Sequence, residues 1–265
     1  MKTDVLGITA LNGADHFSQR ERFAVISKVG FKSVMLAWGT DDCRKESISL
    51  AEEYGLIIEN AHSDMHGCNP LWIDGKEGEE KASQLLKTVD DCGRYGIKTM
   101  IMHLSNGFDT PPLSGIGLKR IERIFDAAKD TGVTIALENA RVCTHLRYVL
   151  DNYTCEHVKF CFDAGHANIW CTDTPWFDLY SQRLAAVHLH DNGGKEDDHQ
   201  IPLTGTVKWD AVLKSIGNSS YCGNLTLETE VKGISDKDDF TEYLRRAYAA
   251  AAKLAEKYDR LEARV

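Results

Sequence analysis

The chain has 265 residues, of which 43% are hydrophobic, and a formal net charge of −9. This length suits a single α/β barrel of roughly 250 residues. No apolar run approaches the roughly 20 residues that span a bilayer, so we expect no membrane partner, and the net charge offers no general attraction for nucleic acid. The start, MKTDVLGITA, lacks a signal-peptide pattern, and the eight cysteines form no CxxC pair. These features predict a cytoplasmic protein with reduced thiols.

Short β-like runs alternate with helical patterns along the whole chain. The predicted strands are 5–9, 33–38, 56–62, 98–103, 133–138, 158–163, 184–190 and 224–228. The predicted helices are 18–29, 42–54, 78–95, 118–131, 144–152, 175–181, 209–216 and 237–258. Glycines that end helices precede several strands, as at Gly96 and Gly132. This alternation predicts an α/β fold, a closed (β/α)8 TIM barrel, with residues 1–265 as one domain.

Four predicted strands place an ionisable side chain opposite their apolar face. In 133–138, Val133, Ile135 and Leu137 share one face, and Glu138 lies on the other. The residues placed in this way, at the carboxyl ends of strands five to eight, are Glu138, Asp163, His188 with His190, and Glu228. Active sites of such barrels are built at that end, so we expect these side chains to share one site.

More histidines and acids accompany these four positions. The additional candidates for metal ligands are His62, His103, His166, Asp197 and His199. Buried carboxylates that face one another repel, and metal cations remove that cost. Mixed N and O donors without thiolate favour Zn²⁺ or Mn²⁺ over Cu⁺, and Mg²⁺ fits the histidines less well. Taken singly, His62 or His103 fits a structural role in the core better than a role as a ligand, and the prediction of a metal site depends on the whole set.

In combination, five motifs resemble the xylose-isomerase-like barrel superfamily, which holds sugar isomerases, ketose 3-epimerases, inosose dehydratases and endonuclease-IV-type AP endonucleases. The motifs are ALEN at Glu138, FDAGH at Asp163 and His166, HLHD at His188, DDHQIPLTGTVKW around His199, and LTLE at Glu228. The resemblance covers essentially the whole chain. Its epimerase branch implies a metal held by Glu138, Asp163, His188 and Glu228, with both glutamates catalytic and His166 in contact with substrate.

These residues predict a metal-dependent isomerase or epimerase of a small sugar, polyol or sugar phosphate. The metal would polarise a carbonyl and acidify the adjacent C–H. One of Glu138 and Glu228 would remove that proton, and the other would return it. A hydride shift, an inosose-dehydratase-like elimination, and binding without turnover are alternatives. The sequence does not determine whether the chain forms a homo-oligomer.

The nuclease relatives offer a hydrolytic alternative, because they use nine ligands for three zinc ions and all nine residue types have counterparts here. The parts directed at DNA look different. After His62 the sequence is SDMHGCN, which lacks the bulky wedge that those nucleases insert into the duplex. The loop after the second strand, GTDDCRKE, begins acidic where a loop that faces DNA should be basic. The sequence therefore argues against a nucleic-acid partner.

The predicted substrate contacts lie on loops at the carboxyl ends of the strands. They are His62, His103, His190, Lys195, Trp38, Trp72 and Trp170. The tryptophans could stack on the apolar face of a sugar, although packing is the common alternative. The epimerases carry an arginine six residues after the strand-seven histidine, where this chain has Gly194 and then Lys195. The substrate contacts of that arginine are therefore not implied here.

Overall fold

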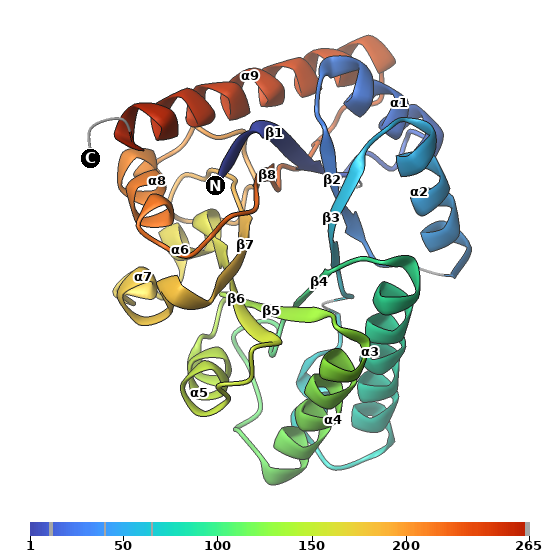
Figure 1. Cartoon of the computed structure of the whole chain (residues 1–265), viewed down its shortest axis with the longest axis vertical. Helices are drawn as coiled ribbons and strands as arrows, with labels where there is room; N and C mark the ends of the chain where they lie inside the picture. The colour runs from blue at the N-terminus through green and yellow to red at the C-terminus, as the bar shows by residue number, and fades with distance from the viewer. Residues whose placement is uncertain (11–12, 40, 65, 263–265) are drawn as a thin grey trace.

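The computed structural model describes residues 1–10, 13–39, 41–64 and 66–262, and its strands form a ring surrounded by helices (Figure 1). The strands are β1 (Lys2–Thr9), β2 (Ser33–Ala37), β3 (Ile57–His62), β4 (Thr99–Met102), β5 (Thr134–Glu138), β6 (Val158–Asp163), β7 (Leu184–His188) and β8 (Asn224–Leu227). The helices are α1 (Gln19–Val29), α2 (Asp41–Glu53), α3 (Lys76–Tyr95), α4 (Gly115–Thr131), α5 (Thr144–Asn152), α6 (Ala164–Ile169), α7 (Trp176–Tyr180), α8 (Trp209–Gly217) and α9 (Lys237–Glu262). Two short 3₁₀ helices are η1 (Asn69–Trp72) and η2 (Ser181–Arg183).

Parallel pairing runs in the order β7-β6-β5-β4-β3-β2-β1-β8. The ring closes between β7 and β8 just beyond the end of β7. There the Leu189 amide donates to the Thr226 carbonyl at 3.0 Å, and the Glu228 amide donates to the Leu189 carbonyl at 3.2 Å. The predicted (β/α)8 TIM barrel is confirmed. In the described part of the chain, no helix is long and apolar enough to cross a membrane.

Local sequence signals explain where the helices begin and end. Ser18 and Glu21 form a reciprocal capping box at the start of α1. Gly96 and Gly132 end α3 and α4 in the left-handed conformation, with φ of 73° and 70°, which favours glycine. One helix, α6, was not predicted. It begins directly after Asp163, whose carboxylate accepts the His166 amide at 2.6 Å.

The main hydrophobic core lies between the strands and the helices. The outward residues of β5 and β6, including Ile135, Leu137 and Phe160, belong to this layer. The inside of the barrel contains smaller apolar side chains, which form a separate cluster of Ile101, Ala136, Cys161 and Ala186. The predicted alternation of faces therefore holds, and the inward face is the one that leads to the site.

A buried polar group occupies the interior toward the amino-terminal ends of the strands. We call it the lower cluster: Ser33, Glu59, Tyr221, Asn224 and Thr226. Glu59 accepts hydrogen bonds from the Tyr221 hydroxyl at 3.3 Å, the Asn224 amide at 3.2 Å and the Thr226 hydroxyl. The Asn224 side chain donates to the Ser33 hydroxyl at 3.3 Å. Burial raises the pKa of Glu59, and the three hydrogen bonds offset only part of this rise.

Candidate metal centre and active site

Four ionisable residues meet at the carboxyl end of the barrel, and we call them the upper cluster: Glu138, Asp163, His188 and Glu228. Glu138, Asp163 and His188 end β5, β6 and β7, and Glu228 follows β8 directly. All four are buried, and one ligand atom from each lies within 4.8 Å of the others. His188 Nδ1 lies 3.3 Å from Glu138 Oε2 and 3.1 Å from Glu228 Oε2. Adjacent parallel strands thus bring together residues that are up to 90 positions apart in the sequence.

The upper cluster contains polar atoms that the described residues leave without a hydrogen bond. They are Glu138 Oε1, Asp163 Oδ2, both ring nitrogens of His188, and Glu228 Oε2. Such atoms are costly to bury unless a ligand satisfies them. Four donors of mixed N and O type, aimed at one point, fit a divalent transition metal. The residues present therefore suit the metal that was predicted from the sequence.

The charges of the upper cluster are arranged for a cation. Burial raises the pKa of Glu138, but the charges of His188 and His103 outweigh it and hold this pKa well below its usual range. Burial lowers the pKa of His188, yet the nearby Cys161, Glu228 and Glu138 raise it well above its usual value. Glu138 therefore stays ionised and helps to hold positive charge on the imidazole of His188. A metal ion can replace that proton.

Cys161 is a sulfur donor that was not predicted from the sequence, and it lies within reach of Glu138 and His188. Burial raises the pKa of the Cys161 thiol to about 12. A metal ion bound at this sulfur would have to displace the thiol proton. Glu138, Cys161 and His188 form one further group that could hold an ion.

A second group shares Glu138 with the upper cluster. His62 Nε2 and His103 Nε2 lie 3.1 Å and 3.0 Å from Glu138 Oε2. The three side chains are buried and could hold an ion together. His62 and His103 were predicted as additional ligands, and the structure brings both to the shared glutamate.

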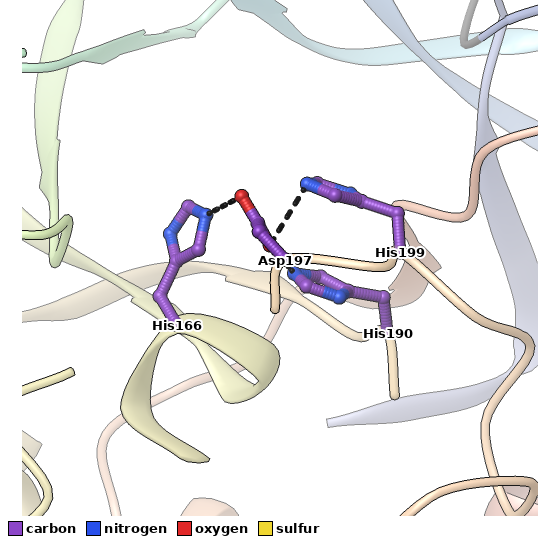
Figure 2. Close-up of side chains that lie close together, drawn as sticks. All are labelled: His166, His190, Asp197 and His199. Carbon is purple, nitrogen blue, oxygen red and sulfur yellow. Dashed lines mark ion pairs between the residues drawn. The ribbon is translucent and has the colours of Figure 1, made fainter. Parts of the chain in front are cut away.

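A third group lies beside the upper cluster and consists of His166, His190, Asp197 and His199 (Figure 2). Asp197 stands between two histidines, with Oδ2 3.4 Å from His166 Nε2 and Oδ1 3.3 Å from His199 Nε2. His190 stacks beneath His199 at 3.9 Å between ring centroids. Burial lowers the pKa of His199, but the hydrogen bond to Asp197 and the charge of Glu228 raise it to about 9.

Backbone carbonyls fix which ring nitrogen each histidine presents. The Nδ1 atoms of His62, His166 and His199 donate at 2.8 Å to the carbonyl oxygens of Ser63, Asn139 and Glu228 respectively. A carbonyl can only accept, so Nδ1 carries the proton and Nε2 is left to face the site. This support orients ligands in metal centres.

With this geometry in place, comparison with known proteins assigns the chain to a family. Residues 23–257 match the family model of the xylose isomerase-like TIM barrel. The chain belongs to this family. The family match concerns the whole barrel. The carboxylate–histidine cluster and its place at the carboxyl end of the barrel are observed directly in the structure of this chain.

Individual relatives of this family member are distant. An uncharacterized protein of Sinorhizobium fredii is 34% identical over 193 residues, which are 65% of this chain and 60% of that protein. The alignment thus spans less than two thirds of the relative. The solved structure of an L-ribulose 3-epimerase covers 96% of this chain and 95% of its own, with a TM-score of 0.75 and 14% identity. A 3-keto-D-glucoside 4-epimerase from E. coli covers 92% of this chain and 98% of its own, with a TM-score of 0.69 and 19% identity. At these identities the two structures establish the shared fold.

Two cavities open beside the three groups. The first, of about 450 Å³ including its mouth, is lined by His62, His103, Ser105, Asn106, Gly107, Glu138, Ala140, Arg141, His166, Trp170, Asp197, His199 and Glu228. The second, of about 920 Å³ including open solvent, has Trp38 in its wall and shares His62 and Glu228 with the first. Trp38 and Trp170, two of the predicted substrate contacts, therefore line different cavities beside the candidate metal ligands.

Three predicted substrate contacts do not line either cavity as the structure describes them. Trp72 is buried, donates to the Leu104 carbonyl at 2.6 Å and packs 4.5 Å from the ring of His145. Lys195 is exposed. His190 lies behind His199 and contacts Asp163 Oδ1 at 3.0 Å. Their placement gives no support to a substrate contact. Trp72 packs in the core, and His190 supports its neighbours.

Two features near the site were not found from the sequence. Asp191 is buried and accepts hydrogen bonds from the Leu203 and Val207 amides and the Trp209 indole at 2.8–3.1 Å. It thereby anchors the segment that carries Asp197. Arg141 lines the first cavity and follows the ALEN motif by two residues. Nothing in the sequence pattern singles out this arginine, and only the structure shows that it lies at the site.

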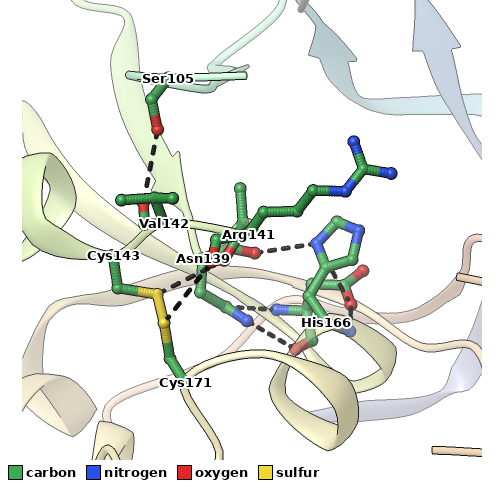
Figure 3. Close-up of a disulfide and its surroundings, with 9 residues drawn as sticks. Ser105, Asn139, Arg141, Val142, Cys143, His166 and Cys171 are labelled. Atoms are coloured by element: carbon green, nitrogen blue, oxygen red, sulfur yellow. Dashed lines mark hydrogen bonds and ion pairs between the residues drawn. A yellow bond between two sulfur atoms is a disulfide. The ribbon is translucent and has the colours of Figure 1, made fainter. Parts of the chain in front are cut away.

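The prediction that all cysteines are reduced is wrong for one pair. Cys143 and Cys171 form a disulfide that joins the loop after β5 to the loop after α6 (Figure 3). The two residues are 28 positions apart, with Cα atoms 6.7 Å apart. Spacing gave no signal, because neighbouring parallel strands bring their following loops together only in the fold. The bridge lies beside Arg141 and Trp170.

Proposed function

We propose that this chain is a divalent-metal-dependent isomerase or epimerase that acts on a small sugar, polyol or sugar phosphate. One observation carries the proposal: two ionised glutamates, Glu138 and Glu228, face the same histidine nitrogen from two sides, at 3.3 Å and 3.1 Å. Both line one cavity. The proposal agrees with the names of structural neighbours, such as the L-ribulose 3-epimerase.

A bound divalent ion would be held by Glu138, Asp163, His188 and Glu228 and would supply Lewis-acid polarisation of a carbonyl. The residues of the chain then divide the proton transfer. One of Glu138 and Glu228 removes the proton from the carbon next to the carbonyl, and the other delivers a proton to the same or a neighbouring carbon. His166 directs Nε2 toward the cavity, where this nitrogen can accept a hydrogen bond from a substrate hydroxyl. Trp170 in the cavity wall restricts water.

The test is proton exchange at carbon. The metal-loaded protein is incubated with a panel of ketoses, inososes and their phosphates in D₂O, and deuterium next to the carbonyl is measured by mass spectrometry. We expect Glu138→Gln and Glu228→Gln to lower exchange by about 10²- to 10⁴-fold. Glu59→Gln, which removes a buried carboxylate from the lower cluster, is the matched control and should retain exchange. Exchange that persists in both site variants would contradict the proposal.

Hydrolysis of abasic DNA is the second candidate, because the groups at His62–His103 and at Asp197–His199 supply donors for further metal ions. Among the described residues, however, the lining of the first cavity includes one arginine and no lysine, a poor match for a polyphosphate backbone. Incision of an abasic duplex at enzymatic rates, lost in His103→Ala, would favour hydrolysis over the isomerase. An inosose-dehydratase-like elimination shares the first proton removal and would show water loss instead of rearrangement.

A further inference from the structure

Three side chains from three loops contact one another at the edge of the first cavity, and we call them the rim triad: Phe108, Arg141 and Trp170. Arg141 and Trp170 line this cavity, and Phe108 packs against both of them. The three residues follow β4, β5 and α6. The Arg141 guanidinium carbon lies 4.7 Å from the Trp170 ring centroid and 5.9 Å from that of Phe108. The two aromatic rings meet edge to face at 6.2 Å. Phe108 is 69% exposed, so the triad lies at the surface.

Arg141 has no counter-charge among the described residues. Its side chain forms no ion pair with them within 4.0 Å, in contrast to Arg44 and Arg120. Arg44 lies 3.3 Å from Asp91, and Arg120 lies 3.5 Å from Glu79. In the lining of the first cavity, as far as the structure describes it, Arg141 is the sole lysine or arginine side chain.

Arg141 lies close to His166, with the Trp170 ring between them. The Trp170 ring lies 4.9 Å from the His166 ring. Trp170 therefore contacts Arg141 on one side and, on the other, His166 of the third candidate metal-binding group. Figure 3 shows its side chain reaching past His166, away from the disulfide. Stacking fixes the guanidinium plane and leaves its N–H edges available. Those edges match the two oxygens of a phosphate or carboxylate.

We infer that the substrate carries a terminal oxyanion, a phosphate or a carboxylate, and that Arg141 binds it while the reacting carbons lie between Glu138 and Glu228. The inference rests on the proposed function for the position of the reacting carbons. It adds a specificity-determining residue and a substrate class. Phe108 and Trp170 hold the guanidinium in place, and Trp170, which lines the cavity, covers the apolar part of the substrate between the oxyanion and the candidate metal ligands.

The test measures binding and needs no turnover, so it can succeed or fail independently of the exchange experiment. Inorganic phosphate and acetate are titrated calorimetrically into metal-loaded wild-type protein, Arg141→Gln, Arg141→Lys and Arg245→Gln. The last variant removes the same charge from the outer helix α9 and is the control. A charge-assisted bidentate contact predicts that Arg141→Gln weakens binding of the preferred anion by about 10- to 100-fold. Arg141→Lys keeps the charge without the fork and should give a smaller loss.

Each outcome decides the inference. Weaker binding in Arg141→Gln with unchanged metal content, unchanged melting temperature and a normal Arg245→Gln supports it. Tighter binding of phosphate than of acetate identifies a phosphorylated substrate, and the reverse identifies a sugar acid. Equal affinity of wild type and Arg141→Gln means that the anion binds elsewhere, for example at the metal, and overturns the inference. Absence of saturable binding of either anion by wild type overturns it as well.

Discussion

The barrel interior contains two buried polar clusters that use similar residues in opposite ways. In the lower cluster, Glu59 satisfies its carboxylate with hydrogen bonds from Tyr221, Asn224 and Thr226. In the upper cluster, Glu138 and Glu228 each keep an oxygen without a hydrogen bond to the described residues. Burial raises the pKa of Glu59. Burial also raises the pKa of Glu228, but the charges of neighbouring histidines outweigh this effect and lower that pKa.

This difference separates a structural buried acid from a functional one. A carboxylate whose partners are neutral donors from its own chain completes the fold and needs nothing more. A carboxylate that faces imidazoles and another carboxylate, with lone pairs left over, is complete only when a cation binds. The residue type is the same in both places, although Glu59 is half-buried and Glu138 and Glu228 are buried. The partners distinguish them.

The largest expected effect comes from the same substitution made once in each cluster. Glu228→Gln should weaken binding of Zn²⁺ or Mn²⁺ by more than about 100-fold, because it removes a charged ligand. Glu59→Gln should leave metal binding unchanged. Saturating metal at about 1,000 times its dissociation constant should stabilise wild type and Glu59→Gln by about 4 kcal/mol and Glu228→Gln by much less. Elemental analysis and thermal melting with and without chelator measure both. Equal metal content in the two variants would remove the distinction between the clusters.

The next effect concerns the disulfide, which borders only the upper end of the barrel. Replacing Cys143 with serine should cost about 2–4 kcal/mol of stability, because the unfolded chain loses a cross-link. The loss should appear as faster amide hydrogen exchange in the loops that carry Arg141 and Trp170, with the lower cluster unchanged. Thiol titration of the unfolded, unreduced chain should find six free cysteines. Eight thiols before reduction would show that the bridge is absent in solution.

The sequence was sufficient for the barrel and for the residues of the upper cluster. Alternation of faces placed Glu138 opposite Leu137, and the structure puts Leu137 in the outer core and Glu138 inside. Such placement depends only on the two-residue period of a strand. The lower cluster was not predicted. Glu59 precedes the end of its strand by three residues, and its partners Tyr221 and Asn224 lie more than 160 positions away.

Loop residues were the weakest part of the prediction for a related reason. Trp72 and Lys195 occur in loops at the correct end of the barrel, but loop conformation decides whether a side chain turns toward the cavity or into the core. Arg141, in contrast, lines the cavity and was missed, because a lone arginine after a strand carries no periodic signal. The stacking partners that define its role come from other loops and become visible only in three dimensions.

The smallest predicted effect is the pH dependence of the lower cluster. Because burial raises the folded-state pKa of Glu59 above its usual 4.5, the folded protein binds this proton more tightly than the unfolded chain. The contribution of Glu59 to stability is therefore full below pH 4.5 and is lost as the pH rises through the folded-state pKa. A glutamine cannot ionise, so Glu59→Gln should gain stability relative to wild type as the pH rises from 5 to 8.

Urea unfolding of wild type and Glu59→Gln across this pH range, with chelator present, measures the difference. The upper cluster is common to both proteins, so its own titration cancels. Stability curves that diverge with rising pH show that Glu59 loses a proton inside the folded barrel, where its neutral donors can no longer satisfy a full charge without cost. Parallel curves would mean that the pKa of Glu59 is the same in the folded and unfolded chains. The lower cluster would then hold an ordinary carboxylate, and its contrast with the upper cluster would rest on hydrogen bonding alone.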